Sequence, residues 1–250
     1  MNRIQLKKQS THLPVSKIQV VADNKLLPPR HSQLFPDNIR ALICGPSGSG
    51  KTNLVFSLLT HPNGLFFENI YILSKSLEQE KYQLLKTIFQ KVKGLKAKFL
   101  ATADELPLPE QCPRNSIVLI DDVLCLKSDK DKIRAFFCFG RHRNIDVIYL
   151  YQTYTHIDKH LLRENCNFII LFAQDTLNLK HVYEDHLMGD CSFDDFKEIC
   201  QLCWREKFGF LTIVKENDIN NGKLRKGLDT FISLSPMNRG KNEFKSKNVK

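Results

Sequence analysis

The sequence predicts an α/β fold, in which helices cover both faces of a doubly wound and mostly parallel sheet. Two observations lead to this prediction. Apolar, β-branched runs bounded by turn signals recur along the chain, and runs of this kind are typical of strands buried on both faces. Segments with apolar residues at helical spacing separate the runs, and this alternation favours parallel strands joined by right-handed crossovers.

The expected elements follow one another along the chain. Strands are expected at Ile39–Cys44, Asn69–Leu73, Ile117–Ile120, Val147–Tyr151, Phe168–Phe172 and Phe208–Val214, with a short additional strand at Lys17–Val21. Helices are expected at Lys51–Leu59, Leu77–Val92, Asp129–Phe137, Ile157–Arg163, Leu177–Leu187 and Phe193–Glu206.

The 250 residues suffice for one substantial core with appendages. Residues 36–221 are predicted to form that domain, after a proline-punctuated arm (1–35) and before a tail (222–250). Residues 1–30 carry a net charge of +5 and residues 222–250 one of +6, which leaves −1 of the total of +10 for the rest. The arms therefore either contact a polyanion or are solvated ends.

The composition indicates an intracellular protein that is neither secreted nor inserted in a membrane. No apolar run approaches the ~20 residues that span a bilayer, and the opening MNRIQLKKQST lacks the apolar segment of a secretory signal. The eight cysteines are consistent with a reducing compartment. The close pair Cys200 and Cys203 is interpreted as part of an apolar helix face; the alternative, a zinc site, would need Cys191 with His181 or His186.

The stretch Gly45-Pro46-Ser47-Gly48-Ser49-Gly50-Lys51-Thr52 fits the pattern of a phosphate-binding loop, G-x-x-x-x-G-K-[ST], between a predicted strand and a predicted helix. Its small residues leave the backbone N–H groups free to point at phosphate oxygens, and the helix N-terminus adds partial positive charge. Lys51 is expected to contact the β- and γ-phosphates, and the Thr52 hydroxyl is expected to bind Mg²⁺.

The strand Ile117–Ile120 leads into a pair of acidic residues. Asp121 is expected to hold Mg²⁺ from the side opposite the loop, and Asp122 to orient or deprotonate the attacking water. The alternative is that the pair caps the following segment. The chain between the loop and this pair contains Asn69–Leu73, which leaves room for a strand inserted between the two nucleotide-binding strands, as in RecA-like motors. No NKxD guanine-reading tetrapeptide occurs, which favours ATP over GTP.

The segment GRHRNIDVIYLYQ, Gly140 to Gln152, resembles the part of the FtsK/HerA superfamily in which a Gly-Arg turn leads into a strand that ends at Gln. Within that superfamily, the order of the motifs is most similar to the genome-packaging ATPases of poxvirus-like large DNA viruses and of Polinton-type elements. The resemblance covers roughly residues 36–215 and implies a RecA-like P-loop NTPase domain.

The resemblance also implies roles for residues and partners. Arg141 is the preferred arginine finger, acting across the interface of a homo-oligomeric ring, with Arg143 and Arg163 as substitutes. Gln152 is expected beside the γ-phosphate as its sensor. Asp122 departs from the Glu that many members carry at the second acidic position.

The predicted function is therefore a Mg²⁺-dependent ATPase that assembles as a ring and translocates double-stranded DNA into a viral or virus-like capsid. Two alternatives remain: another DNA-directed ATPase, such as a ring helicase or initiator, and a non-catalytic nucleotide-binding module.

Overall fold

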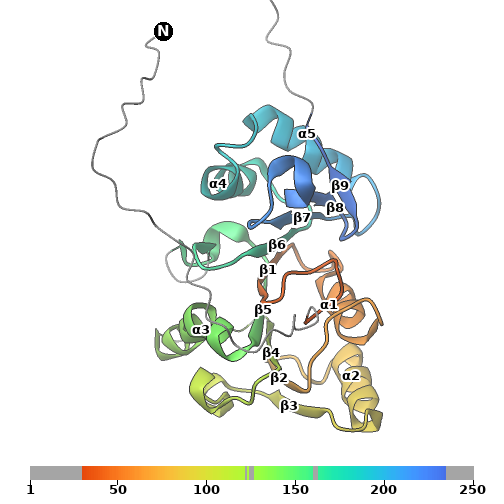
Figure 1. The fold of residues 1–250 in the computed structure, drawn as a ribbon, viewed down its shortest axis with the longest axis vertical. Helices are drawn as coiled ribbons and strands as arrows, with labels where there is room; N and C mark the ends of the chain where they lie inside the picture. The colour runs from red at the N-terminus through yellow and green to blue at the C-terminus, as the bar shows by residue number, and fades with distance from the viewer. Residues whose placement is uncertain (1–29, 122, 124–126, 160–162, 235–250) are drawn as a thin grey trace, which may run out of the picture.

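The protein is described from a computed structural model, which covers residues 30–234 except 122, 124–126 and 160–162. The predicted strand Lys17–Val21 lies outside these residues, as do most of the two charged arms. The described residues form a nine-stranded sheet with the order β3-β2-β4-β5-β1-β6-β7-β8-β9 (Figure 1). The six strands from β3 to β6 are parallel to their neighbours, and β7, β8 and β9 each run antiparallel to the preceding strand in that order.

The six predicted strands are confirmed, with ends that differ by a few residues, and three further strands were not predicted. The strands are β1 Arg40–Cys44, β2 Asn69–Ser74, β3 Lys96–Leu100, β4 Ser116–Asp121, β5 Ile145–Tyr151, β6 Phe168–Leu171, β7 Leu211–Val214, β8 Leu224–Lys226 and β9 Thr230–Ile232. One strand is inserted between β1 and β4, as expected, but it is β5. The strand β2 instead pairs with the outer side of β4.

Five helices of the described residues match predicted ones: α1 Lys51–Thr60, α2 Glu80–Lys91, α3 Lys127–Phe139, α4 Thr176–His186 and α5 Phe193–Trp204. The predicted helix Ile157–Arg163 includes residues outside the described part of the chain. Short helical turns lie at Ala103–Glu105 (η1), Pro109–Gln111 (η2), Gly140–Arg143 (η3), Tyr154–His156 (η4) and Ile219–Lys223 (η6). None of the described helices is both long enough and apolar enough to cross a bilayer.

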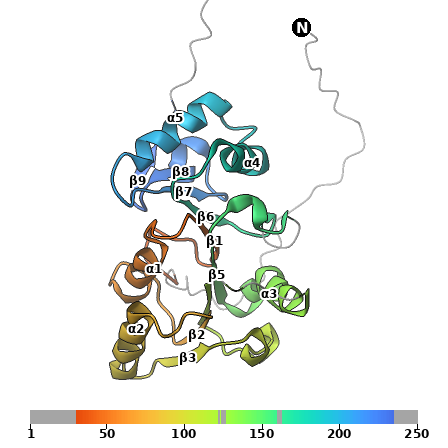
Figure 2. The same cartoon turned by 180° about the vertical axis from the view of Figure 1, so that it is seen from behind.

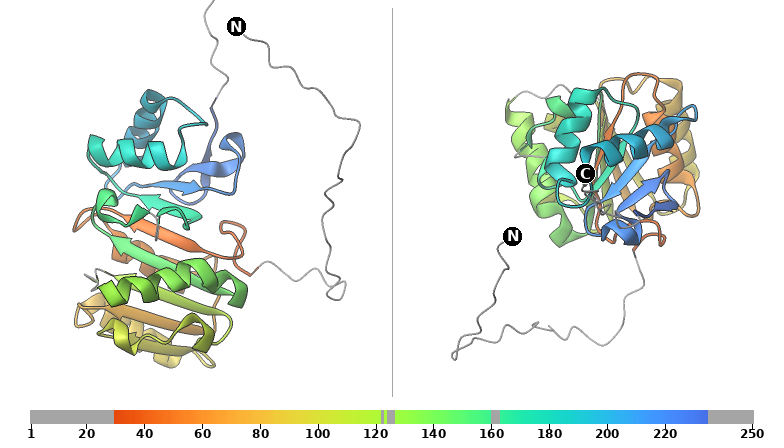
Figure 3. Two further views of the ribbon diagram at one scale, coloured as in Figure 1. Left: turned by 90° about the vertical axis from the view of Figure 1, so that its left-hand side faces the viewer. Right: turned by 90° about the horizontal axis from the view of Figure 1, so that it is seen from above.

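The helices lie on both faces of the sheet. The α1 and α2 helices cover one face and α3 covers the other, which is visible from behind and from above (Figures 2 and 3). Alternate residues of each central strand face opposite layers. In β4, Val118 and Ile120 belong to the buried cluster that includes side chains of α3, whereas Ile117 and Leu119 belong to the cluster that includes side chains of α1 and α2. The strands are therefore buried on both faces, as their continuous apolar runs predicted.

The sheet continues past the predicted domain end at residue 221, because β8 and β9 add two antiparallel strands. The basic residue Arg225 belongs to this extension and is only 4% exposed. Its guanidinium donates to the backbone carbonyls of Gly222, Leu34 and Leu228. The positive charge of Arg225, which the sequence assigned to a tail, thus lies inside the fold, where backbone carbonyls accept hydrogen bonds from its guanidinium.

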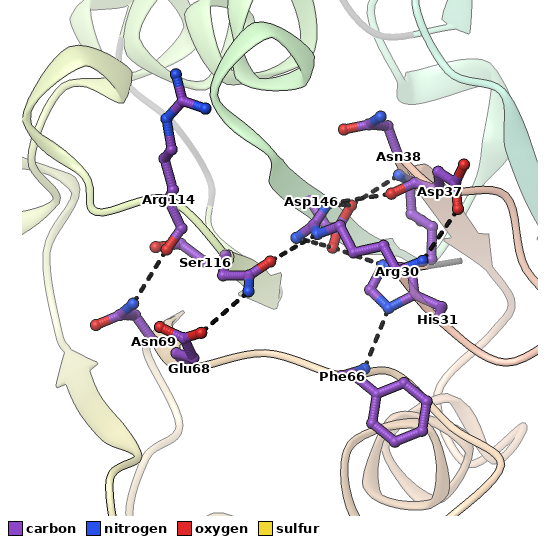
Figure 4. A network of polar contacts seen from close by, with 12 residues as sticks. Arg30, His31, Asp37, Asn38, Phe66, Glu68, Asn69, Arg114, Ser116 and Asp146 are labelled. Carbon is purple, nitrogen blue, oxygen red and sulfur yellow. Dashed lines mark hydrogen bonds and ion pairs between the residues drawn. The ribbon is translucent and has the colours of Figure 1, made fainter. Parts of the chain in front are cut away.

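The segment before β1 is fixed to the sheet by a buried polar network (Figure 4). Asp146, the second residue of β5, is fully buried and accepts a hydrogen bond from the Ile39 backbone N–H at 2.8 Å. Arg30 pairs with the same carboxylate at 2.8 Å, and His31 Nε2 lies 3.0 Å from it. Because His31 Nδ1 accepts from the Phe66 N–H, Nε2 is the nitrogen that donates to Asp146. The described part of the fold therefore includes Arg30 and His31, which the sequence placed in the arm.

Replacement of Asp146 with alanine is expected to lower the free energy of unfolding by about 3–5 kcal/mol, because it leaves Arg30 buried without its counter-charge. Urea unfolding of the full chain measures this change. The matched control is Asp194→Ala, which removes a carboxylate that is 88% exposed and pairs with Lys197. Equal unfolding midpoints for the two variants would contradict the role given to the network.

The pair Cys200 and Cys203 lies in the apolar face of α5, as the favoured interpretation predicted. Both side chains are buried, together with Phe196 and Ile199 of the same helix. Burial raises the pKa of the Cys203 thiol to about 11 and raises that of Cys200 as well. A raised pKa keeps the thiols protonated, which is the form of a packing residue.

Candidate nucleotide site

The phosphate loop, Gly45–Thr52, joins the carboxyl end of β1 to the first residues of α1. Its start is held to the neighbouring strand, since the Gly45 N–H donates to the Tyr151 carbonyl at 3.1 Å. Gly48 has a φ of 76° and Gly50, the residue that caps α1, has a φ of 107°. Side chains are disfavoured at such angles, so glycine is needed at both positions. The loop therefore has the backbone path that its sequence pattern predicted.

Gly45 is required for a second reason, which is close packing. A Cβ atom at Gly45 would lie 2.7 Å from the Phe172 Cβ and 2.6 Å from the Ser49 Oγ. The Ser49 hydroxyl is buried and has no hydrogen-bond partner among the described residues. The loop therefore packs tightly against Phe172, the residue after β6, and the Ser49 hydroxyl is buried within it.

Replacement of Gly45 with alanine is expected to displace the loop and weaken nucleotide binding at least about tenfold, because Phe172 is fixed in the core and cannot yield. Titration with a non-hydrolysable ATP analogue measures the affinity. Gly189→Ala is the control, since a Cβ there meets no atom within 4 Å and the backbone φ is not positive. Unchanged affinity of the Gly45 variant would contradict the packing argument.

Lys51 is the first residue of α1, and its side chain folds back over the loop. The ammonium donates to the carbonyls of Gly45 at 2.6 Å and Pro46 at 3.0 Å. These contacts hold a positive charge at the centre of the loop. The same ammonium can donate to a phosphate oxygen placed there.

Asp121 is the last residue of β4, at the same edge of the sheet as the phosphate loop. Its carboxylate accepts a hydrogen bond from the hydroxyl of Tyr82, a buried side chain of α2. This bond fixes the orientation of one carboxylate oxygen. The α2 helix thereby positions the acidic group that the sequence predicted as a metal ligand.

One cavity of about 300 Å³ brings the predicted groups together. Residues 47–52 of the loop line it, and so do Asp121 and Gln152, the residue after β5. The adjacent acidic residue, Asp122, lies outside the described residues. The expected meeting of the phosphate loop with the carboxyl end of β4 is therefore present, with Lys51 and Thr52 among the residues that line the cavity.

Arg141 lies at the opposite edge of the sheet. It is exposed in the η3 turn between α3 and β5, at the amino end of the strand whose carboxyl end leads to Gln152. The seven residues of β5 span roughly 20 Å at ~3.3 Å per residue, which is beyond the reach of an arginine side chain. Arg141 is therefore outside this cavity.

The two substitute arginines differ from Arg141 in exposure. Arg143 is half-buried in the same turn. The Arg163 side chain is 11% exposed and donates to Asp185 at 2.7 Å, in a network with Tyr154. Because an internal carboxylate already pairs with Arg163, Arg141 is the most accessible of the three.

Two residues of this site, Tyr82 and Phe208, were not predicted from the sequence. Tyr82 follows the helical spacing of Leu85 and Phe89, so it was indistinguishable from a core residue. Phe208 was predicted as the first residue of a strand, but β7 begins three residues later. The Phe208 ring instead lines the cavity beside the phosphate loop.

The residues present fit a magnesium-bound triphosphate. The glycine positions of the loop form a cradle that a Cβ would fill at Gly45, and its curve holds the buried Ser49 hydroxyl. Lys51 supplies a cation for phosphate, and hydroxyl and carboxylate oxygens are the ligands that Mg²⁺ prefers. Thr52 and Asp121 supply such oxygens on the wall of the same cavity.

A phosphate loop after the central strand of a mostly parallel sheet, sharing a cavity with an aspartate at the end of β4, identifies a P-loop NTPase fold. Sequence comparison gives the family. The model described as "Poxvirus A32 protein" matches residues 30–189, and the chain belongs to that family. The resemblance to viral packaging ATPases of the FtsK/HerA type is thus confirmed. No curated protein matches the sequence.

One solved structure supports the same fold. The genome packaging NTPase B204 of Sulfolobus turreted icosahedral virus 2, in complex with sulfate, is 12% identical with a TM-score of 0.51. The alignment covers 79% of this chain and 98% of B204. The AMP complex of B204 is 14% identical with a TM-score of 0.46, covering 72% and 94% of the two chains.

Proposed function

We propose that this protein is a Mg²⁺-dependent ATPase that assembles as a ring and moves double-stranded DNA into a viral or virus-like capsid. The observation that carries the proposal is the convergence of the phosphate loop, Asp121 and Gln152 on one cavity. Membership in the A32 family supports a role in packaging, as does the fold shared with B204, which is described as a genome packaging NTPase.

The chemistry follows from the groups at the cavity. Lys51 and the loop N–H groups bind and orient the β- and γ-phosphates. Thr52 and Asp121 would hold Mg²⁺, which neutralises charge that develops on the phosphate oxygens. Asp122 is proposed to orient or activate the attacking water, and Gln152 to detect the γ-phosphate. The hydrogen bond from the Tyr82 hydroxyl holds the Asp121 carboxylate in one orientation, in which it can act as a metal ligand.

The placement of Arg141 supports a ring. Its own cavity is at the far edge of the sheet, so any contact between Arg141 and a γ-phosphate has to be made in a neighbouring subunit. Head-to-tail contacts of this kind join two different surfaces, and they close into rings when the rotation permits. In such a ring, hydrolysis at one interface would change the contacts of the neighbouring subunit.

The basic arms support a duplex partner that is held without sequence readout. Residues 1–29 and 235–250, which exclude the basic side chains already paired within the fold, each carry a net charge of +4, and lysine and arginine contact phosphates irrespective of sequence. DNA binding is therefore expected to weaken steeply as the salt concentration rises.

The test is translocation on blunt duplex DNA that carries a triplex-forming oligonucleotide at its far end, with native mass recorded in parallel. ATP-dependent release of the oligonucleotide by an oligomer of defined size is expected. Strand separation on a forked duplex without release from the blunt one would support the ring helicase instead. Nucleotide binding without turnover, with or without DNA, would leave only the non-catalytic module.

A further inference from the structure

An aromatic side chain, Phe208, lines the cavity beside the phosphate loop. Phe208 is 50% exposed. It approaches the loop closely, because a Cβ on Gly50 would lie 3.3 Å from its Cδ1 atom. Because half of this ring is exposed and it lies against the loop, the ring is within reach of a ligand bound in the cavity.

The backbone holds this ring in an unfavourable conformation. Phe208 has a φ of 67°, in the left-handed region that non-glycine residues rarely adopt. The next residue, Gly209, donates to the Glu206 carbonyl at 2.9 Å, and a Cβ there would lie 2.2 Å from the Cys203 carbonyl oxygen. The tight turn after α5 therefore fixes Phe208. Backbone strain that is kept without a gain in burial is typical of a functional residue.

The strand order gives the direction in which a nucleotide lies. Asp121 and Gln152 follow β4 and β5, on one side of the loop after β1. Phe208 precedes β7, which lies on the other side of the loop, beyond β6. A triphosphate whose γ end faces the metal-binding carboxylate has its nucleoside end toward β6 and β7. That end meets the Phe208 ring.

We infer that Phe208 is the stacking surface for the base of a purine nucleoside triphosphate. The inference rests on the proposed function, since it requires the triphosphate to lie in the loop. An aromatic ring offers its face to the face of a base, and a contact of this kind tolerates different bases. Phe208 therefore strengthens binding of the nucleoside without reading its hydrogen-bonding edge.

The experiment compares two ligands by calorimetric titration with Mg²⁺ present: a non-hydrolysable ATP analogue and inorganic tripolyphosphate. Phe208→Ala is expected to weaken binding of the ATP analogue about tenfold, which is the scale of one base–aromatic stack. Binding of tripolyphosphate is expected to stay unchanged, because it has no base. Phe208→Tyr keeps the ring and should bind both ligands as the wild type does.

Two further variants separate stacking from folding. Phe208→Gly relieves the positive φ, so its unfolding midpoint should equal or exceed that of the wild type while affinity for the ATP analogue falls. Phe66→Ala is the matched control, because that ring is 51% exposed and lies before β2, at the opposite edge of the sheet. It should bind both ligands normally.

The outcomes distinguish this inference from the proposed function. Unchanged affinity of Phe208→Ala for the ATP analogue would overturn the stacking role and leave the ATPase proposal intact. Equal losses for both ligands would also overturn it, since they would show that the phosphate loop itself was disturbed. A wild-type protein that binds neither ligand would overturn the proposed function and this inference with it.

Discussion

Replacing Lys51 with alanine lowers the rate of ATP turnover by about 10²–10³-fold or more, as expected for the loss of a donor aimed at charge that develops in the transition state. The Lys51 ammonium lies over the loop, within hydrogen-bonding distance of the Gly45 and Pro46 carbonyls. Its removal leaves the loop backbone in place but deletes the cation. The variant should therefore fold normally and fail in hydrolysis.

The matched control is Lys180→Ala, which deletes an ammonium on α4 from a side chain that is 63% exposed. Steady-state turnover and the urea unfolding midpoint are measured for both variants. A Lys51 variant that hydrolyses ATP at the rate of the control would contradict the assignment of the phosphate loop. A lowered unfolding midpoint in the Lys51 variant alone would mean that its loss of rate reflects folding.

Mixing two inactive variants is expected to restore turnover that neither has alone. Arg141→Ala subunits keep an intact cavity but lack the finger, and Lys51→Ala subunits lack the cavity but keep the finger. In a head-to-tail ring of randomly mixed subunits, about a quarter of the interfaces join an intact cavity to an intact finger. The gain should be large, because an arginine finger contributes ~10³–10⁵-fold in rate.

The control for this experiment is Arg134→Ala, which removes an exposed arginine of α3, the helix that precedes the η3 turn. That variant should be active alone and should gain nothing when it is mixed. Native mass establishes that the subunits exchange into common rings. A mixture of the two inactive variants that stays at the level of its parents would contradict action of Arg141 across the interface.

The central part of the fold could be predicted from the sequence, because its strands are buried on both faces and are therefore continuously apolar. The strands that escaped prediction lie in less apolar surroundings. The edge strand β3, Lys96–Leu100, alternates lysine with apolar residues, as exposed edges do. In β8, the charge of Arg225 suggested a solvated tail, although backbone carbonyls satisfy it inside the fold.

Part of the candidate nucleotide site could likewise be predicted from the sequence, and part could not. The phosphate loop and Asp121 could be predicted, because the spacing of their residue types is dictated by the phosphate and the metal. Tyr82 could not, since a helical residue that contacts a carboxylate has the same periodicity as one that packs in the core. The role of Phe208 could not be predicted either. Its residue type continues the apolar run that follows it, and the hydrophobic pattern does not report a left-handed φ.

ATP turnover measured with and without long duplex DNA, at fixed Mg²⁺, tests the central claim most directly. The wild type is expected to hydrolyse ATP under these conditions and to do so faster on duplex DNA, with the gain lost at high salt. A protein that shows no turnover under either condition would contradict the assignment of the cavity lined by Lys51, Thr52 and Asp121 as a catalytic site.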